Sequence, residues 1–173
     1  MRKVGVYFQS GAAFQSDDIK WAGAFIFTYA EGIYYPRRKR DMNLSGSCLC
    51  RGGQYEIHGP LSDVYHCHCS MCRKLHAAAF RTCGKISAAD WRTRCGEDLI
   101  RFYESSPGEH KAFCSVCGSS LFTRFDDRPQ VYGFPLGTLD SDPGVRPAKH
   151  VFVASKAPWF EITDALPQHD GFG

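Results

Sequence analysis

Cysteines are the residues of this chain whose number and spacing most clearly suggest chemistry. The chain has nine of them in 173 residues, an odd number that disulfides alone cannot use completely. Seven form three clusters with the spacing of metal ligands: Cys48-Leu49-Cys50, Cys67-His68-Cys69-Ser70-Met71-Cys72 and Cys114-Ser115-Val116-Cys117-Gly118. Because thiolates are favoured ligands of zinc, these clusters predict bound zinc. We expect the two single cysteines, Cys83 and Cys95, to be buried free thiols that behave as small hydrophobic side chains.

The third cluster has the C-x-x-C-G pattern of a zinc knuckle, in which two thiolates bind one ion from a tight turn. A structural zinc needs four ligands, so Cys114 and Cys117 require a second pair. Cys48 and Cys50 can supply it, because residues i and i+2 of an extended strand face the same side. The alternative is a thioredoxin-like redox pair, which needs a βαβ context. No helix of useful length is predicted after Cys117, so zinc is favoured.

The middle cluster places three thiols within six residues, at Cys67, Cys69 and Cys72. Three protein ligands with one open position are typical of a catalytic zinc, whereas a structural zinc has four protein ligands. The alternative is that a histidine completes the site, and the candidates are His66, His68 and His76. On an ideal strand His66 and His68 point away from the cysteines, whereas a helical turn could bring His76 within reach.

Short strands are predicted around these clusters. The runs with strand-like alternation or composition are residues 54–58, 63–67, 78–86, 99–103, 111–113, 121–125, 131–134 and 151–153. Helical turns are expected at residues 70–75 and at Trp91, after the capping sequence Ser87-Ala88-Ala89-Asp90. Strands and helices do not alternate, which argues against a parallel sheet. The sequence therefore predicts a mostly antiparallel β domain with two zinc sites that hold its loops.

Residues 1–41 differ from the rest of the chain. They contain no cysteine or histidine, carry seven basic and four acidic residues, and end in Arg37-Arg38-Lys39-Arg40 just before Met42. One hypothesis is that the domain starts at Met42 and that the leader is extraneous. The alternatives for the basic run are a solvated linker and a nuclear or nucleic-acid patch. We expect a leader of residues 1–41 and a zinc-binding domain of residues 42–173.

Charge and hydropathy limit the partners of the domain. Residues 42–173 are formally neutral, whereas a nucleic-acid-binding domain normally has a basic excess, so no nucleic acid is expected. The longest apolar stretch, residues 21–30, is about half the ~20 residues that cross a membrane. Polar residues interrupt any secretory signal near the start. Free thiols suit a reducing compartment, which predicts a cytoplasmic protein.

Five segments together resemble the glutathione-dependent formaldehyde-activating enzyme family, which also includes centromere protein V-like members. They are Ser45-Gly46-Ser47-Cys48-Leu49-Cys50-Arg51-Gly52-Gly53, His66-Cys67-His68-Cys69-Ser70-Met71-Cys72-Arg73-Lys74, Phe113-Cys114-Ser115-Val116-Cys117-Gly118-Ser119, Gly137-Thr138-Leu139-Asp140 and His150-Val151-Phe152-Val153-Ala154-Ser155-Lys156-Ala157-Pro158-Trp159. The resemblance implies a stacked antiparallel β fold, or β-tent, with two zinc ions per chain. The structural ion would take Cys48, Cys50, Cys114 and Cys117, and the active-site ion Cys67, Cys69 and Cys72. One departure is Ala77, where many members have glycine.

The resemblance also implies an activity, the condensation of glutathione with formaldehyde to S-(hydroxymethyl)glutathione. This is a carbon–sulfur lyase reaction run in reverse. A zinc ion held by three thiolates suits it, because a coordinated substrate thiol loses its proton. Arg73 and Lys74 are candidates to bind the carboxylates of glutathione, and His76 is a possible proton carrier. The alternative is a zinc-stabilised binding module without turnover.

A chain that begins at Met42 is expected to fold with the zinc content and the melting temperature of the full chain, because the leader supplies no metal ligand. Metal analysis and thermal unfolding of both chains measure this. A melting temperature lower by more than about 5 °C, on the order of 1 kcal/mol, would show that the leader packs on the core.

Overall fold

The computed structural model describes residues 28–29, 32–33 and 43–173. The chain divides into two compact units, Met1–Arg38 and Lys39–Gly173. In the first unit the described residues are the antiparallel pair β1 (Thr28–Tyr29) and β2 (Gly32–Ile33). The expected leader of residues 1–41 lies largely outside the described residues, so its boundary with the domain stays a prediction.

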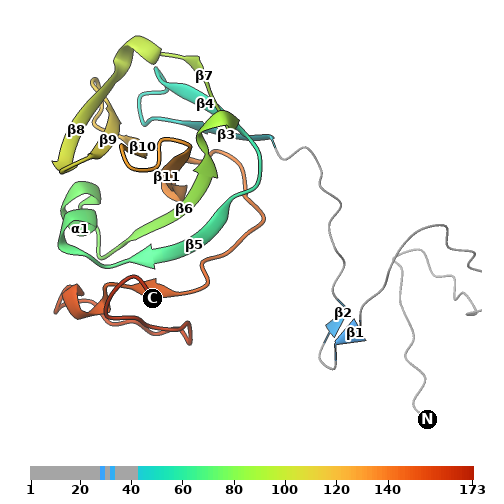
Figure 1. The fold of residues 1–173 in the computed structure, drawn as a ribbon, viewed down its shortest axis with the longest axis vertical. Helices are drawn as coiled ribbons and strands as arrows, with labels where there is room; N and C mark the ends of the chain where they lie inside the picture. The colour runs from blue at the N-terminus through green and yellow to red at the C-terminus, as the bar shows by residue number, and fades with distance from the viewer. Residues whose placement is uncertain (1–27, 30–31, 34–42) are drawn as a thin grey trace, which may run out of the picture. The chain divides into compact units, whose positions relative to one another are not determined.

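Two β sheets build the second unit (Figure 1). The larger sheet has the strand order β12 (His150–Val151), β5 (Ser62–Cys67), β6 (Arg81–Ser87), β11 (Val131–Pro135), β10 (Ser120–Phe125), β9 (Glu109–Cys114) and β8 (Ile100–Ser106). The smaller sheet has the order β3 (Asn43–Ser47), β4 (Gln54–His58) and β7 (Trp91–Cys95). All neighbouring strands are antiparallel except β12, which runs parallel to β5. The prediction of a mostly β fold of stacked antiparallel sheets is confirmed.

Aromatic side chains fill the core that joins the two sheets. In β4 the alternation of buried and exposed residues turns Tyr55 and Ile57 inward. The Tyr55 ring stacks on Trp91 of β7 with 4.2 Å between centroids, and Trp91 in turn lies 4.8 Å from Phe122 of β10. Such ring pairs add stabilisation beyond the area that they bury. The core therefore fixes the small sheet against the middle of the large one.

Helical structure is short, as expected. Of the described residues, only α1 (Ser70–His76) forms an α-helix, and it lies beside β5 and β6 (Figure 1). The predicted turn at residues 70–75 is confirmed, but the helical turn expected at Trp91 is wrong. Ser87 accepts a hydrogen bond from the Ala89 N–H and caps a 3₁₀ turn, η1 (Ala88–Asp90), which ends before Trp91. Trp91 begins β7, and its ring packs in the core against Tyr55 and Phe122.

Two strands of the second unit were not predicted from the sequence, β3 and β7. β3 has the sequence Asn-Leu-Ser-Gly-Ser, which has low strand propensity, and it pairs along its whole length with β4. Gly46 is required there, because a Cβ atom would come within 2.1 Å of the Tyr55 ring. No helix in the described part of the chain is long and apolar enough to span a membrane.

Replacing Ala77 by glycine is expected to stabilise the domain. Ala77 ends α1 in the left-handed conformation, at φ 47° and ψ 44°. This conformation costs an L-residue about 1–2 kcal/mol, and glycine avoids that cost. The greater conformational entropy of the unfolded chain with glycine cancels part of the gain. Ala77→Gly should raise the free energy of unfolding by about 0.5–1 kcal/mol in urea titrations. Ala78→Gly is the matched control, since Ala78 has no positive φ, and it should not stabilise.

Candidate metal centres and substrate cavity

The first cysteine cluster joins turns that are far apart in sequence. Cys48 and Cys50 lie in the turn after β3, where the Cys48 N–H donates to the Gly53 carbonyl. The expectation of an extended strand at this pair is therefore wrong. Cys114 ends β9, and Cys117 lies in the turn that leads to β10. The Sγ atoms of all four residues lie within 4.8 Å of one another.

A glycine makes the second of these turns possible. Gly118 has a φ of 74°, which favours glycine, and its N–H donates to the Cys114 carbonyl at 2.8 Å. The chain then returns directly into β10, so no helix follows Cys117. This excludes the helix that a thioredoxin-like redox pair would need.

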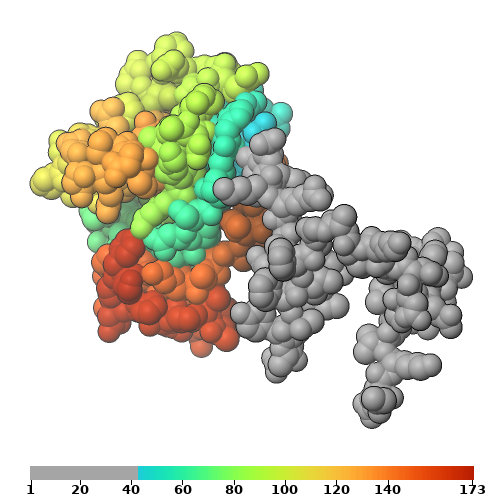
Figure 2. Space-filling view, turned by 45° about the vertical axis from the view of Figure 1, so that its right-hand side comes forward, coloured from blue at the N-terminus to red at the C-terminus, as the bar shows by residue number. Residues whose placement is uncertain are grey.

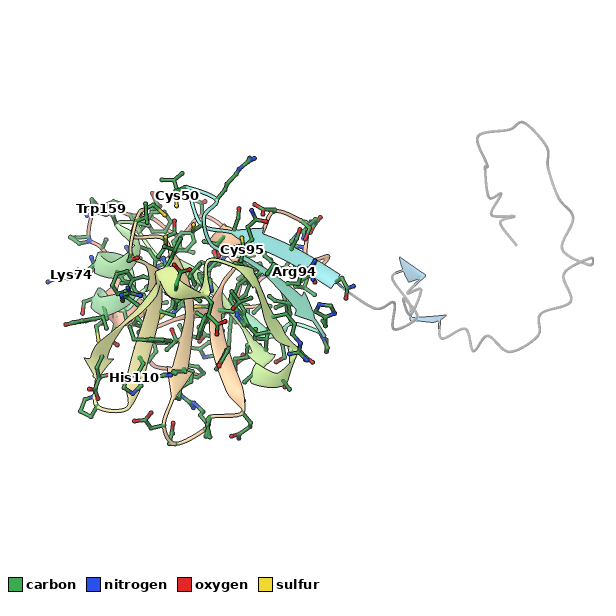
Figure 3. The ribbon with its side chains drawn as sticks, turned by 90° about the horizontal axis from the view of Figure 1, so that it is seen from above. Cys50, Lys74, Arg94, Cys95, His110 and Trp159 are labelled. Carbon is green, nitrogen blue, oxygen red and sulfur yellow. The ribbon has the colours of Figure 1, made fainter. Side chains whose placement is uncertain are left out.

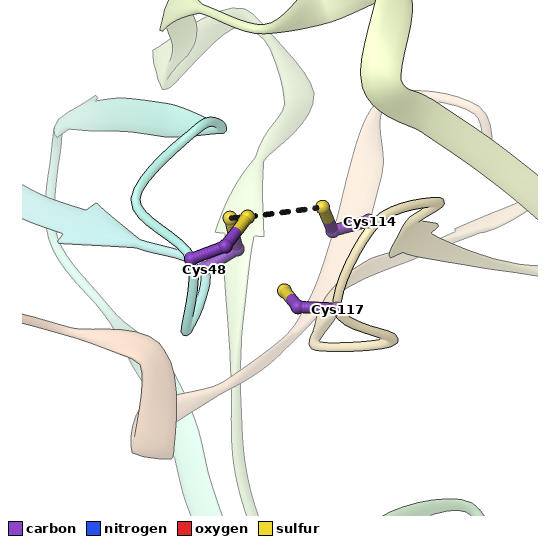
Figure 4. Close-up of side chains that lie close together, drawn as sticks. Cys48, Cys114 and Cys117 are labelled. Carbon is purple, nitrogen blue, oxygen red and sulfur yellow. Dashed lines mark hydrogen bonds between the residues drawn. The ribbon is translucent and has the colours of Figure 1, made fainter.

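The four sulfurs fit a tetrahedral metal ion. Four zinc–sulfur bonds of about 2.3 Å place the sulfurs about 3.8 Å apart. The Sγ of Cys50 lies 3.4 Å from that of Cys48 and 3.9 Å from that of Cys114. Burial raises the pKa of Cys117, but hydrogen bonds from Ser119 and the neighbouring cysteines lower it to about 5, which favours the thiolate. The sulfurs of Cys48, Cys114 and Cys117 turn toward one another in Figure 4.

The second cluster is local. Cys67 ends β5, Cys69 is the N-cap of α1, and Cys72 lies in the first turn of that helix. Their Sγ atoms lie within 4.8 Å of one another. The Cys72 N–H donates to the Cys69 sulfur at 3.3 Å, and hydrogen bonds from the Cys67 and Cys72 side chains lower the pKa of Cys69 to about 2. Three soft donors on one strand end and one helix start also fit a zinc ion.

No described histidine or carboxylate joins these three sulfurs. His68 directly follows β5 and is fully buried, and its Nε2 lies 2.8 Å from Nδ1 of His150. Nδ1 of His66 lies 2.9 Å from the Thr82 hydroxyl. Among the described residues the second cluster therefore offers three ligands, and not four.

A hydrogen-bond chain, which the sequence analysis missed, begins at the buried His68 beside the second cluster and ends at the exposed Asp164. It runs from His68 through His150 to Asp164, whose carboxylate lies 3.1 Å from Nε2 of His150. His150 also pairs with His66 across β12 and β5. Figure 2 shows the C-terminal segment, in red, packed beside the turquoise and green residues of this region. The segment thus holds the strand that carries Cys67.

A cavity of about 640 Å³ opens in front of the second cluster. All three cysteines of the cluster are part of its wall. Its aromatic wall is made of Tyr65, Tyr103, Phe125, Phe152 and Phe172. Its charged residues are Lys74, Arg81, Lys85, Lys111 and Arg128, against a single acidic residue of the lining, Glu109. An apolar pocket with an excess of cations suits a small organic anion.

The structure does not bring together the three residues that were expected to contact substrate, because Arg73 lines neither of the two hollows that Lys74 and His76 line. Lys74 is exposed on α1 and lines the cavity (Figure 3), whereas Arg73 does not. His76 lines a separate hollow of about 510 Å³, where burial and the charge of Arg81 lower its pKa to about 4. The sequence analysis missed Arg81 and Lys111, because only strand pairing brings them to the cavity.

The two single cysteines differ from each other. Cys83 is buried on β6 and lines the cavity, and burial raises its pKa to about 11. Cys95 is exposed at the end of β7, so the expectation that it is buried is wrong (Figure 3). Cys95 is the last residue of β7, and its exposed Sγ lies 3.5 Å from the Gly52 carbonyl.

Comparison with known proteins identifies the family. A family model described as glutathione-dependent formaldehyde-activating enzyme matches residues 43–155, which is more than half of the chain. The chain belongs to this family, and membership implies glutathione and formaldehyde as substrates. A crystal structure of a Rhodobacter sphaeroides protein is 24% identical, with a TM-score of 0.48 over 60% of this chain and 91% of that chain. A comparison with curated proteins gives no match.

The two clusters are expected to fail differently when one cysteine is lost. Cys117→Ser should give an unfolded or aggregated protein, because the first cluster closes a long loop and its metal-binding free energy is folding free energy. Cys69→Ser should stay folded with one zinc per chain, since the second cluster closes only a short loop. Circular dichroism and metal analysis measure both, with Cys95→Ser as the control outside the clusters. A folded Cys117→Ser beside an unfolded Cys69→Ser would reverse the assignment.

Proposed function

We propose that this protein is a zinc-dependent carbon–sulfur lyase that acts on glutathione adducts. Its reaction would be the reversible formation of S-(hydroxymethyl)glutathione from glutathione and formaldehyde. The observation that carries the proposal is the cluster of three cysteine sulfurs in the wall of a cavity of about 640 Å³. The family supports the two substrates, and the cations of the cavity suit the carboxylates of glutathione.

The proposed metal content is two zinc ions per chain. Cys48, Cys50, Cys114 and Cys117 would hold the structural ion, and Cys67, Cys69 and Cys72 the active-site ion. When bound at the second cluster, zinc supplies a site that keeps a substrate thiol in its thiolate form. Three thiolate ligands give this site a negative charge, which makes it a weak activator of water. Thiol chemistry is therefore favoured over hydrolysis.

The remaining steps belong to the protein. In the synthetic direction the sulfur of glutathione bonds to the carbonyl carbon of formaldehyde, and the thiol proton ends on the new hydroxyl oxygen. Tyr65, Phe152 and Phe172 form apolar walls that keep water from the reacting atoms. Lys74 lies at the cavity where it can attract a carboxylate. The roles of Arg73 in binding substrate and of His76 in carrying a proton stay predictions.

We also propose a cytoplasmic location. None of the nine cysteines, all of which lie in the described residues, forms a disulfide, and a reducing compartment keeps cysteines in that state.

Glutathione is expected to bind the zinc-loaded protein through its sulfur. S-methylglutathione keeps both carboxylates but has no ionisable thiol, so its affinity in calorimetry should be at least tenfold lower, about 1.4 kcal/mol. Equal affinities would show that the second cluster is not the anchor.

Turnover decides between an enzyme and a binding module. The exchange of ¹³C-formaldehyde with S-(hydroxymethyl)glutathione should be faster with the protein than without it, as measured by nuclear magnetic resonance. Cys69→Ser should return the exchange to the uncatalysed rate, whereas Cys95→Ser should not change it. Binding of glutathione with no acceleration by the zinc-loaded protein would leave the binding module as the function.

A further inference from the structure

Arg81 occupies a distinctive position in the cavity. It is the first residue of β6 and pairs directly with Cys67 across β5 and β6. Side chains at directly opposite positions of neighbouring strands have Cβ atoms only about 5 Å apart. Arg81 also lines both the large cavity and the smaller hollow that contains His76. Its side chain therefore lies in the wall beside the second cysteine cluster.

Arg81 is a buried cation whose charge acts on the sulfurs of Cys72 and Cys83, but its side chain makes no hydrogen bond to a described residue. The residue is only 7% exposed, and its buried Nε has no hydrogen-bond acceptor. No carboxylate of the described residues forms an ion pair with it. Removing an unpaired charge from water is costly, and proteins normally pair such a group or use it.

Each of the other cations of the cavity has an acidic or aromatic partner or is exposed to solvent. Lys85 pairs with Asp63, and Lys111 pairs with Glu109 at 3.0 Å. The guanidinium of Arg128 lies over the Phe125 ring at 4.2 Å, and Lys74 is exposed to solvent. Arg81 is thus the cation of the lining that combines deep burial with an unused set of donors.

We propose that Arg81 is a specificity-determining residue that binds a carboxylate of the substrate beside the reacting sulfur. A guanidinium offers two parallel N–H donors that match the two oxygens of a carboxylate. The inference rests on the proposed function for the identity of the substrate, but not for the binding of the anion. Two sources share this chemistry: a carboxylate of glutathione, and the carboxylate of an acidic aldehyde such as glyoxylate. Addition to glyoxylate balances as it does for formaldehyde: the sulfur bonds to the aldehyde carbon, and the thiol proton moves to its oxygen.

Small thiols test the binding of a carboxylate without turnover. Mercaptoacetate carries a thiol and a carboxylate, and 2-mercaptoethanol has a neutral hydroxyl at the same place. Calorimetry on the zinc-loaded full chain should show a preference for mercaptoacetate that falls at least fivefold in Arg81→Gln. Arg94→Gln removes the same charge on the opposite side of the domain from Lys74 (Figure 3), and it should keep the preference of the unchanged protein.

Retention of the preference in Arg81→Gln, or equal weakening of both thiols, would overturn the proposal. Equal weakening would make Arg81 a charge partner of the cysteine sulfurs. Metal analysis and circular dichroism accompany each variant. If Arg81→Gln loses zinc, Arg81→Lys decides, because lysine keeps the charge but lacks the paired donors. Its preference should fall at least threefold with unchanged zinc content, and an unchanged preference would contradict the proposal.

Two further arms identify the source of the carboxylate. If it belongs to the aldehyde, Arg81→Gln should lower kcat/KM for glyoxylate at least tenfold more than for formaldehyde. If it belongs to glutathione, esterifying the glycine carboxylate should weaken binding to the unchanged protein and have no effect on Arg81→Gln. An absence of turnover with either aldehyde would contradict the proposed function, and the comparison of small thiols would still test Arg81.

Discussion

The domain depends on bringing four cysteine sulfurs from two distant turns to one point. The turn after β3 belongs to the small sheet, and the turn between β9 and β10 belongs to the large one. Between them the Tyr55–Trp91–Phe122 stack supplies the apolar contact, but the turns themselves contain exposed residues such as Leu49 and Val116. Cys48 and Cys114 are buried at the edge of the core, whereas Cys50 is exposed, so a metal ion at the four sulfurs would join the two turns where the apolar contact ends.

The second cluster differs from the first because its three cysteines are close together in sequence. Cys67, Cys69 and Cys72 come from one strand end and the helix that follows, so their arrangement needs no distant loop. The distant parts of the chain supply the surroundings instead. β6 brings Arg81, β9 brings Lys111, and the C-terminal residues bring Phe172 to the same cavity. The three sulfurs of the second cluster are thus local in sequence, whereas the cavity in front of them is assembled by the sheet.

This difference explains how much could be predicted from the sequence. The cysteine clusters were visible because metal ligands repeat at short spacings, and β4 was predicted at its observed bounds, residues 54–58, because its side chains alternate. Trp91 was expected in a helical turn and Cys95 was expected to be buried, whereas both lie in β7, whose pairing with β4 the local pattern does not reveal. Arg81 carried no local signal at all. Its importance follows from its burial opposite Cys67, which only the register of β5 and β6 determines.

The parallel pairing of β12 with β5 means that the strand that carries Cys67 is completed by a segment that is synthesised much later. His150 follows its hydrogen-bond partner His68 by 82 residues. Its own N–H donates to the Pro167 carbonyl, and its carbonyl accepts from the His169 N–H. A ribosome that adds about 5–20 residues per second needs roughly 4–16 s to cross that interval. During translation the three thiols of the second cluster therefore emerge well before the segment that supports their strand. In this interval they meet the metal pool and the oxidants of the cell as part of an incomplete sheet.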